Sequence, residues 1–118
     1  MNEKTAIKTN LNGIVNVNKP LGITSHDVVY RLRKILNIKK IGHTGTLDPD
    51  ASGVLPMCVG RATKTADMLT ASDKQYIAEV TMGTATDTLD ASGTVTDTAD
   101  VNVTEADIKK FSANLSGI

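Results

Sequence analysis

The sequence predicts an α+β domain built on a mixed, largely antiparallel sheet with flanking helices. Three observations support this class. Two segments have the spacing of a helix capping box, short apolar or alternating runs surround them, and turn-forming residues separate those runs. Because helices fall between some of the predicted strands and a hairpin joins others, we expect both parallel and antiparallel pairings.

The first half of the chain reads as strand, helix, strand and short helix. Residues 13–18 form a short strand that ends in a Lys-Pro-Leu-Gly turn. Thr24 and Asp27 have capping-box spacing and should open a helix. Residues 54–59 form an apolar run typical of a buried strand, and residues 63–70 a short helix. The inward face of the first helix should consist of Val28, Leu32, Ile35 and Leu36.

The second half predicts a hairpin followed by a helix. Residues 76–82 alternate between apolar and polar side chains, which indicates a strand. Residues 84–93 form a turn-rich loop, and residues 94–98 a short return strand. Thr104 begins a second capping-box pattern. The helix that follows should point three residues inward, namely Ile108, Phe111 and Leu115.

Composition limits the class of protein. The 118 residues suffice for about one domain, and 40% hydrophobic with 22% charged residues is ordinary for a globular protein. The single cysteine, Cys58, excludes an internal disulfide and should be buried in its apolar run. Residues 1–12 are polar, lack a secretory signal and are expected to be flexible, and no segment approaches a membrane span. We therefore expect a protein of the reducing cytoplasm with no membrane partner.

The formal net charge of zero conceals a gradient along the chain. Residues 1–64 hold ten Lys and Arg against four Asp and Glu, whereas residues 65–118 hold three against nine. A basic half beside an acidic half fits an anionic partner that docks on one side. Solvated charged faces that cancel account for the same numbers, so charge alone leaves both interpretations open.

The loop Gly-His-Thr-Gly-Thr-Leu-Asp-Pro, residues 42–49, is the strongest candidate for a functional site. A carboxylate at Asp48 is ionised at neutral pH and could act as nucleophile or base. Pro49 pushes Asp48 into extended geometry, and the glycines Gly42, Gly45 and Gly53 permit tight turns and close approach of a ligand. From the loop alone, a plain turn in which Asp48 bonds neighbouring amides is the favoured interpretation.

Other chemistries fit the residues less well. The chain has no phosphate loop and no nucleophile elbow. A metal site from His43, Asp48 and Asp50, with Asp87 or Asp90 added, stays open, as does a glycosidase-like carboxylate pair of Asp48 with Asp90. The residues by themselves therefore predict a site with a positioned aspartate and no defined reaction.

Three long motifs in this order resemble the TruB family of tRNA pseudouridine synthases. Residues 42–56 look like the catalytic motif, residues 17–25 like an earlier Lys-Pro motif and residues 83–93 like a later motif. The resemblance implies a pseudouridine-synthase-like catalytic domain that converts uridine to pseudouridine at position 55, in the T-loop of tRNA. It also implies that Asp48 is catalytic and that neither a cofactor nor a metal is needed.

The resemblance implies further roles. His43 would occupy the gap left by the flipped uridine, and Tyr76 would pack against that base. Lys19 and Pro20 would brace the active-site loop. The remaining predicted residues would contact RNA of the T-loop and T-stem or shape the loops, namely Arg61, Lys64, Thr88, Asp90, Gly42, Gly45, Pro49, Gly53 and Gly93. A structural alternative stays open for most of them: a histidine bonding its own loop, a core tyrosine, surface turns and solvated cations.

The family's chain is longer than this sequence. We expect residues 13–118 to be the N-terminal portion of a truncated catalytic domain that lacks the basic partner of the catalytic aspartate and a C-terminal RNA-binding domain. Such a chain should show little or no turnover alone and should self-associate through an open sheet edge. The stand-alone bacterial kind is favoured over the RNA-guided, dyskerin-type relatives. A non-catalytic RNA-binding module and a metal-dependent hydrolase remain the alternatives.

Overall fold

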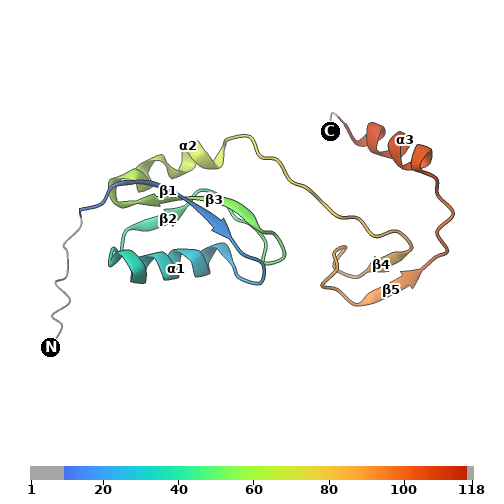
Figure 1. Cartoon of the computed structure of the whole chain (residues 1–118), viewed down its shortest axis with the longest axis horizontal. Helices are drawn as coiled ribbons and strands as arrows, with labels where there is room; N and C mark the ends of the chain where they lie inside the picture. Colours follow the sequence, from blue (N-terminus) through green and yellow to red (C-terminus); the bar gives the residue numbers. More distant parts are fainter. Residues whose placement is uncertain (1–9, 117–118) are drawn as a thin grey trace. The chain divides into compact units, whose positions relative to one another are not determined.

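The computed structural model describes residues 10–116, so most of the predicted flexible segment at 1–12 lies outside the described residues. The contacts divide the chain into two units, Met1–Lys74 and Gln75–Ile118. The first unit contains a three-stranded sheet with helices, and the second a two-stranded hairpin with one helix (Figure 1). The α+β class is the predicted one, and every strand pairing among the described residues is antiparallel.

The sheet of the first unit has the strand order β1-β3-β2. These strands are β1 (Gly13–Lys19), β2 (Ile41–His43) and β3 (Gly53–Val59). The predicted strands at 13–18 and 54–59 are confirmed, whereas β2 was not predicted as a strand, and two of its residues fall in the predicted loop 42–49. In the β1–β3 register, Gly13 lies opposite Val59 and Lys19 opposite Gly53. The start of β3 therefore lies beside the end of β1, and the end of β3 lies beside the start of β1.

Helix α1 (Ser25–Leu36) begins where its capping box predicts. The hydroxyl of Thr24 accepts a hydrogen bond from the Asp27 amide at 3.0 Å, and the Asp27 carboxylate accepts one from the Thr24 amide at 2.9 Å. The bonds to the backbone and side chain of Thr24 lower the pKa of Asp27 from its ordinary value. The helix ends at Asn37, which has a left-handed φ of 53°.

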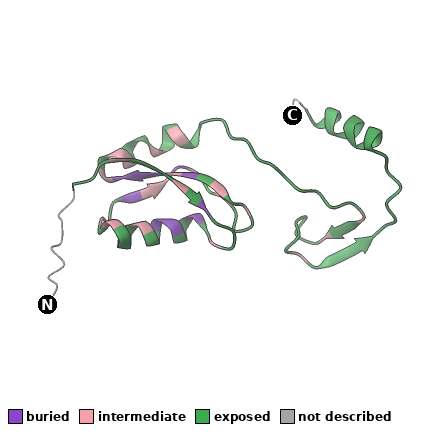
Figure 2. Cartoon of the chain, viewed as in Figure 1, coloured by how far each residue is buried: buried purple, intermediate pink, exposed green. Residues whose placement is uncertain are grey.

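The hydrophobic core of the first unit lies between α1 and the sheet, as the buried positions in Figure 2 show. One prediction about this face was wrong: Ile35 is 76% exposed, whereas Val29 is buried. At about 100° per residue, Val28, Val29 and Leu36 span an arc of the helix, and Ile35 falls just outside it. The core consists of Val28, Val29, Ile41, Leu55, Met57 and Val59.

The opposite face of β3 carries Cys58, which is buried as predicted. Its sulfur lies 4.0 Å from the hydroxyl of Thr65 in the 3₁₀ helix η1 (Gly60–Thr65). Helix α2 (Ala66–Thr70) continues directly from η1. The short helix predicted at 63–70 is therefore present but is split between two helix types.

In the second unit, the predicted strand at 76–82 was wrong. These residues have no strand pairing, and side chains such as Tyr76 and Val80 are 61% and 75% exposed. A strand is defined by a partner backbone, and no described residue pairs with this segment. The hairpin forms instead between β4 (Thr84–Thr86) and β5 (Val95–Thr98), which confirms the return strand.

Helix α3 (Glu105–Leu115) begins at the predicted capping box of Thr104 and Asp107. The inward positions predicted for Ile108, Phe111 and Leu115 were wrong, because these side chains are 47%, 66% and 53% exposed. Their spacing still places them on one helix face, but no described residue of the second unit is buried (Figure 2). No helix within residues 10–116 is both long and apolar enough to cross a membrane.

The core predicts a contrast between two methionines. Met57 is fully buried in β3, whereas Met68 in α2 is 77% exposed. The change Met57→Ala should lower the free energy of unfolding by about 2–5 kcal/mol, since it leaves a cavity. The control Met68→Ala should change it by less than about 0.5 kcal/mol. Urea unfolding followed by circular dichroism measures both, and equal losses would contradict the assigned core.

Candidate active site

Asp48 lies in the loop between β2 and β3, at the end of the sheet where Lys19 pairs with Gly53. The residue is exposed, and its carboxylate has no hydrogen-bond or ion-pair partner among residues 10–116. The turn in which this carboxylate bonds neighbouring amides is therefore not the geometry observed. A charged group that faces solvent without a partner is free to meet a substrate.

Both neighbours of Asp48 in the chain are fixed through their main-chain atoms. The hydroxyl of Ser25 accepts a hydrogen bond from the Leu47 amide at 2.9 Å and donates one to the Leu47 carbonyl at 3.2 Å. The Gly22 amide donates to the Pro49 carbonyl at 2.8 Å. We call these contacts of Ser25 and Gly22 the two-point clamp. It orders the backbone on both sides of Asp48 and leaves the carboxylate unpaired.

The loop after Asp48 closes as a tight turn. The Asp48 carbonyl accepts a hydrogen bond from the Ala51 amide at 2.9 Å, with Pro49 in the second position of the turn. Proline is favoured there because its ring presets φ. Gly45 and Gly53, which flank the turn, both have φ of +136°. Side chains rarely adopt this conformation, so the loop-shaping role predicted for these two glycines has a backbone reason.

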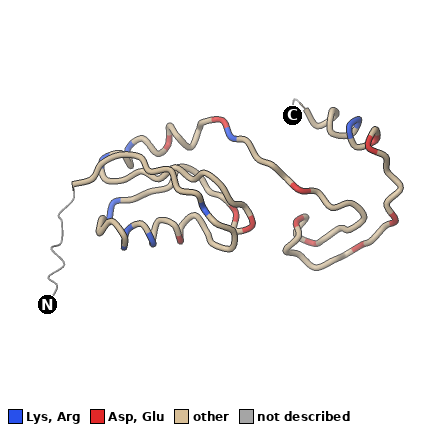
Figure 3. The backbone as a smooth tube through the Cα atoms, viewed as in Figure 1, with Lys and Arg blue, Asp and Glu red and all other residues tan. Residues whose placement is uncertain are grey.

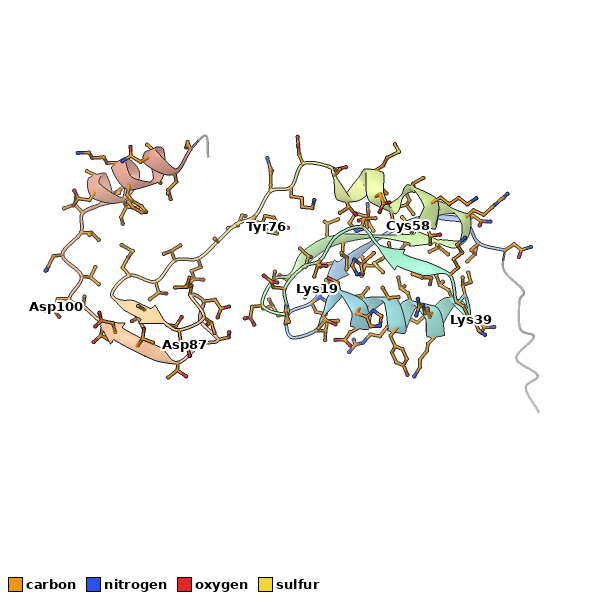
Figure 4. All side chains as sticks on the ribbon, turned by 180° about the vertical axis from the view of Figure 1, so that it is seen from behind. Lys19, Lys39, Cys58, Tyr76, Asp87 and Asp100 are labelled. Carbon is orange, nitrogen blue, oxygen red and sulfur yellow. The ribbon has the colours of Figure 1, made fainter. Side chains whose placement is uncertain are left out.

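Lys19 is fully buried at the end of β1 (Figure 4). Its ammonium donates hydrogen bonds to the carbonyls of Pro20 at 2.9 Å and Ile23 at 2.7 Å. A buried cation requires such acceptors, because desolvation is otherwise costly. The ammonium therefore closes the turn that contains Gly22 and leads into the helix that begins with Ser25. This geometry favours the bracing role for Lys19 over a plain surface turn.

The start of the loop is fixed to β3. Thr44 is buried, and both its amide, at 3.2 Å, and its hydroxyl, at 2.8 Å, donate to the Pro56 carbonyl. His43 ends β2 opposite Met57. Its Nδ1 atom is buried and has no partner among the described residues. The histidine is therefore held by the sheet, and its Nδ1 does not bond its own loop.

Arg61 and Lys64 belong to η1, at the other end of β3 from Asp48. Both side chains are exposed. The Arg61 amide donates a hydrogen bond to the Asn12 side-chain oxygen at 2.7 Å. This bond connects the residue before β1 to the start of η1. The seven residues of β3, about 20 Å of strand, separate the start of η1 from the end of the Asp48 loop. Figure 3 shows that the Lys and Arg residues are concentrated in the first unit.

The remaining predicted residues, in the range 76–93, belong to the second unit. The Asp90 carboxylate accepts hydrogen bonds from the Ser92 hydroxyl at 2.5 Å, the Ser92 amide at 2.9 Å and the Thr88 hydroxyl at 2.7 Å. The bonds from Ser92, then Thr88, lower the pKa of Asp90 from its ordinary value. A side chain at Gly93 would collide with the Thr88 hydroxyl. The geometry of Thr88, Asp90 and Gly93 is that of a self-bonded turn.

The structure thus brings Lys19, His43 and Asp48 into one unit and leaves residues 76–93 in the other. Sequence reasoning missed Ser25 and Thr44 as supports of the loop. A signal for Ser25 was present, because Thr24 already serves as helix cap and leaves the adjacent hydroxyl free for another partner. Within residues 10–116, no group of three His, Cys, Asp or Glu side chains is arranged to hold a metal ion.

The chain matches a family model described as TruB family pseudouridylate synthase (N terminal domain) over residues 33–118. It is 65% identical to tRNA pseudouridine synthase B of Clostridioides difficile over 83 aligned residues. This alignment covers 70% of this chain and 28% of the relative. It is 56% identical to the protein of the same name from Bacillus cytotoxicus over 109 aligned residues. This alignment covers 91% of this chain and 36% of the relative.

Solved structures also resemble part of the chain. One is an H/ACA ribonucleoprotein bound to a substrate RNA containing 2′-deoxyuridine, with 47% identity and a TM-score of 0.47. The match covers 50% of this chain and 18% of that one. The chain spans about a third of the length of the curated relatives it matches.

The buried ammonium of Lys19 predicts a loss of stability that a surface lysine does not show. The change Lys19→Met keeps an unbranched side chain of similar length but removes the ammonium and its hydrogen bonds to the carbonyls of Pro20 and Ile23. It should lower the free energy of unfolding by about 1.5–3 kcal/mol, the range for hydrogen bonds to a charged group. Exposed Lys39 provides the control, since Lys39→Met should cost less than about 0.5 kcal/mol. Urea unfolding distinguishes the two, and a neutral Lys19→Met would refute the bracing role.

Proposed function

Because this chain belongs to the TruB family of pseudouridylate synthases, we propose that it carries the catalytic aspartate of an enzyme that isomerises uridine to pseudouridine in tRNA. The observation that supports this most directly is the unpaired, exposed carboxylate of Asp48 between two anchored neighbours. The site is position 55 in the T-loop, as the motif resemblance implies.

The reaction rearranges bonds within one nucleotide. The bond between N1 and C1′ breaks, the base turns, and C5 bonds to C1′, while C5 loses a proton and N1 gains one. Since the product is an isomer of the substrate, the balance requires no oxidant, reductant or group donor. An ionised Asp48 could attack C1′, add to the base or remove a sugar proton. All three routes require this carboxylate beside a uridine that has left the base stack.

Eversion of the uridine costs a few kcal/mol, which contacts elsewhere on the RNA must offset. Arg61 and Lys64, which are exposed beyond the other end of β3, would supply phosphate contacts to the T-stem. His43 would fill the vacated position in the stack, and Tyr76 would pack against the flipped base. Binding should therefore weaken as the salt concentration rises.

Recognition would depend on the shape of a folded RNA rather than on stacking along a single strand. The chain has only three aromatic residues, Tyr30, Tyr76 and Phe111. The ammonium of Lys34 lies over one face of the Tyr30 ring, 4.4 Å from its centre. Few free aromatic faces remain for a stacking platform, which is the usual device of single-strand binders. A folded tRNA in the cytoplasm is thus the proposed substrate.

The 118-residue chain is also proposed to self-associate. Residues 76–82 expose an unpaired backbone with apolar side chains, among them Ile77 at full exposure. Helix α3 exposes Ile108, Phe111 and Leu115 on one face. A segment with exposed apolar side chains, and with no strand partner among residues 10–116, can pair with another copy.

The catalytic role of Asp48 predicts a specific loss of activity. In the protein at its natural length, Asp48→Asn should lower pseudouridine formation by about 10⁴-fold or more, because the ionised oxygen pair is lost. Binding of tRNA should persist, since the amide occupies the same space. Exposed Asp67 in α2 provides the control, because Asp67→Asn should leave the rate unchanged. Mapping of pseudouridine in tRNA measures the activity, and a filter-binding assay measures the binding of tRNA.

Full activity of Asp48→Asn would refute the proposed function. Absence of any wild-type activity with intact RNA binding would favour a non-catalytic binding module.

Self-association predicts a concentration-dependent mass. The purified 118-residue chain should exceed the monomer mass of 12.5 kDa in light scattering at high concentration. The change Ile77→Lys should reduce this excess, because a charge on the exposed segment disfavours pairing. A mass of one chain at every concentration would exclude the proposal.

A further inference from the structure

We propose that Ser25 is a positioning residue for Asp48: its side chain, buried under the loop, sets the direction in which the catalytic carboxylate points. The inference rests on the proposed function and extends it to a residue that does not contact the substrate. Ser25 is 1% exposed, and its hydroxyl lies 22 positions away in sequence from the residue that it binds.

The hydroxyl of Ser25 engages both polar main-chain groups of Leu47. The Leu47 amide belongs to the peptide plane before that residue, and its carbonyl belongs to the plane that also contains the Asp48 nitrogen. A single side chain therefore restrains two consecutive peptide planes. Rotation about the Leu47 backbone, which would swing the Asp48 side chain, breaks at least one of the bonds at 2.9 and 3.2 Å.

Ser25 is itself held rigidly. It is the first residue of α1, and the next turn of that helix places Val28 and Val29 in the hydrophobic core. The hydroxyl is not needed for the helix, because Thr24 provides the capping box. The bonds to Leu47 are the hydrogen bonds that the structure gives to this side chain, which makes the loop its partner rather than the helix.

Loss of the hydroxyl should affect the chemical step more than RNA binding. The Gly22 contact to Pro49 would remain, so the loop keeps one of its two anchors. Leu47 is only partly buried, and its freed groups can turn toward water. The carboxylate would then sample a wider range of directions, and a displacement of about 1 Å at a reacting group costs about 10²-fold in rate. Phosphate contacts at the far end of β3 would be untouched.

Three variants of the natural-length protein test the inference. Ser25→Ala removes both hydrogen bonds, whereas Ser25→Cys fills the same space with a weaker donor and acceptor. Leu36→Ala is the control, because it weakens the packing of the same helix at its opposite end without removing a hydrogen bond to Leu47. The measurements are kcat and KM for pseudouridine formation on tRNA, below the unfolding temperature of every variant, and the melting temperature.

We expect kcat to fall by about 10- to 100-fold for Ser25→Ala with KM changed by less than about threefold. Ser25→Cys should show a smaller fall in kcat, and it decides the outcome if Ser25→Ala does not fold. Leu36→Ala should lower the melting temperature with kcat unchanged. The inference is overturned if kcat of the Ser25 variants stays within about twofold of the control, or if only KM changes. Activity of the wild type and inactivity of Asp48→Asn test the proposed function separately in the same assay.

Discussion

One serine hydroxyl bonded to both main-chain groups of Leu47 is the contact on which the geometry of the candidate site depends. An ionised carboxylate cannot be both free for a substrate and held by its own hydrogen bonds. The chain resolves this conflict by anchoring the residues on either side of Asp48 and leaving its side chain unpaired. The backbone contacts of Leu47 and Pro49 therefore orient Asp48, and its carboxylate oxygens stay available to react.

The clamp in turn requires a rigid base, and the buried ammonium of Lys19 provides it. A lysine with no exposure is uncommon unless its protons find acceptors, and here the carbonyls of the following turn serve. This arrangement links β1, the turn and the start of α1 into one block behind the loop. Two motifs that are separate in the sequence, at 17–25 and 42–56, thus form a single structural element (Figures 1 and 4).

The two units differ in how far their apolar side chains are buried. The first unit closes a core between α1 and the sheet, whereas no described residue of the second unit is buried. Its helix and hairpin are nevertheless well capped and well bonded locally, as the Thr104 capping box and the Asp90 turn show. Local hydrogen bonds define where these elements begin and turn, but they cannot bury an apolar face.

Local signals in the sequence determined where α1 and α3 begin, which apolar run becomes the central strand and which loop carries Asp48. Capping boxes, proline and glycine act over four or five residues, so they can be read without knowing the fold. Tertiary structure alone decided that residues 76–82 have no strand partner among residues 10–116, that Ile35 and the α3 face are exposed, and that Ser25 bonds Leu47. These outcomes depend on which backbone or surface comes within reach across the chain. No pattern of neighbouring residues contains that information.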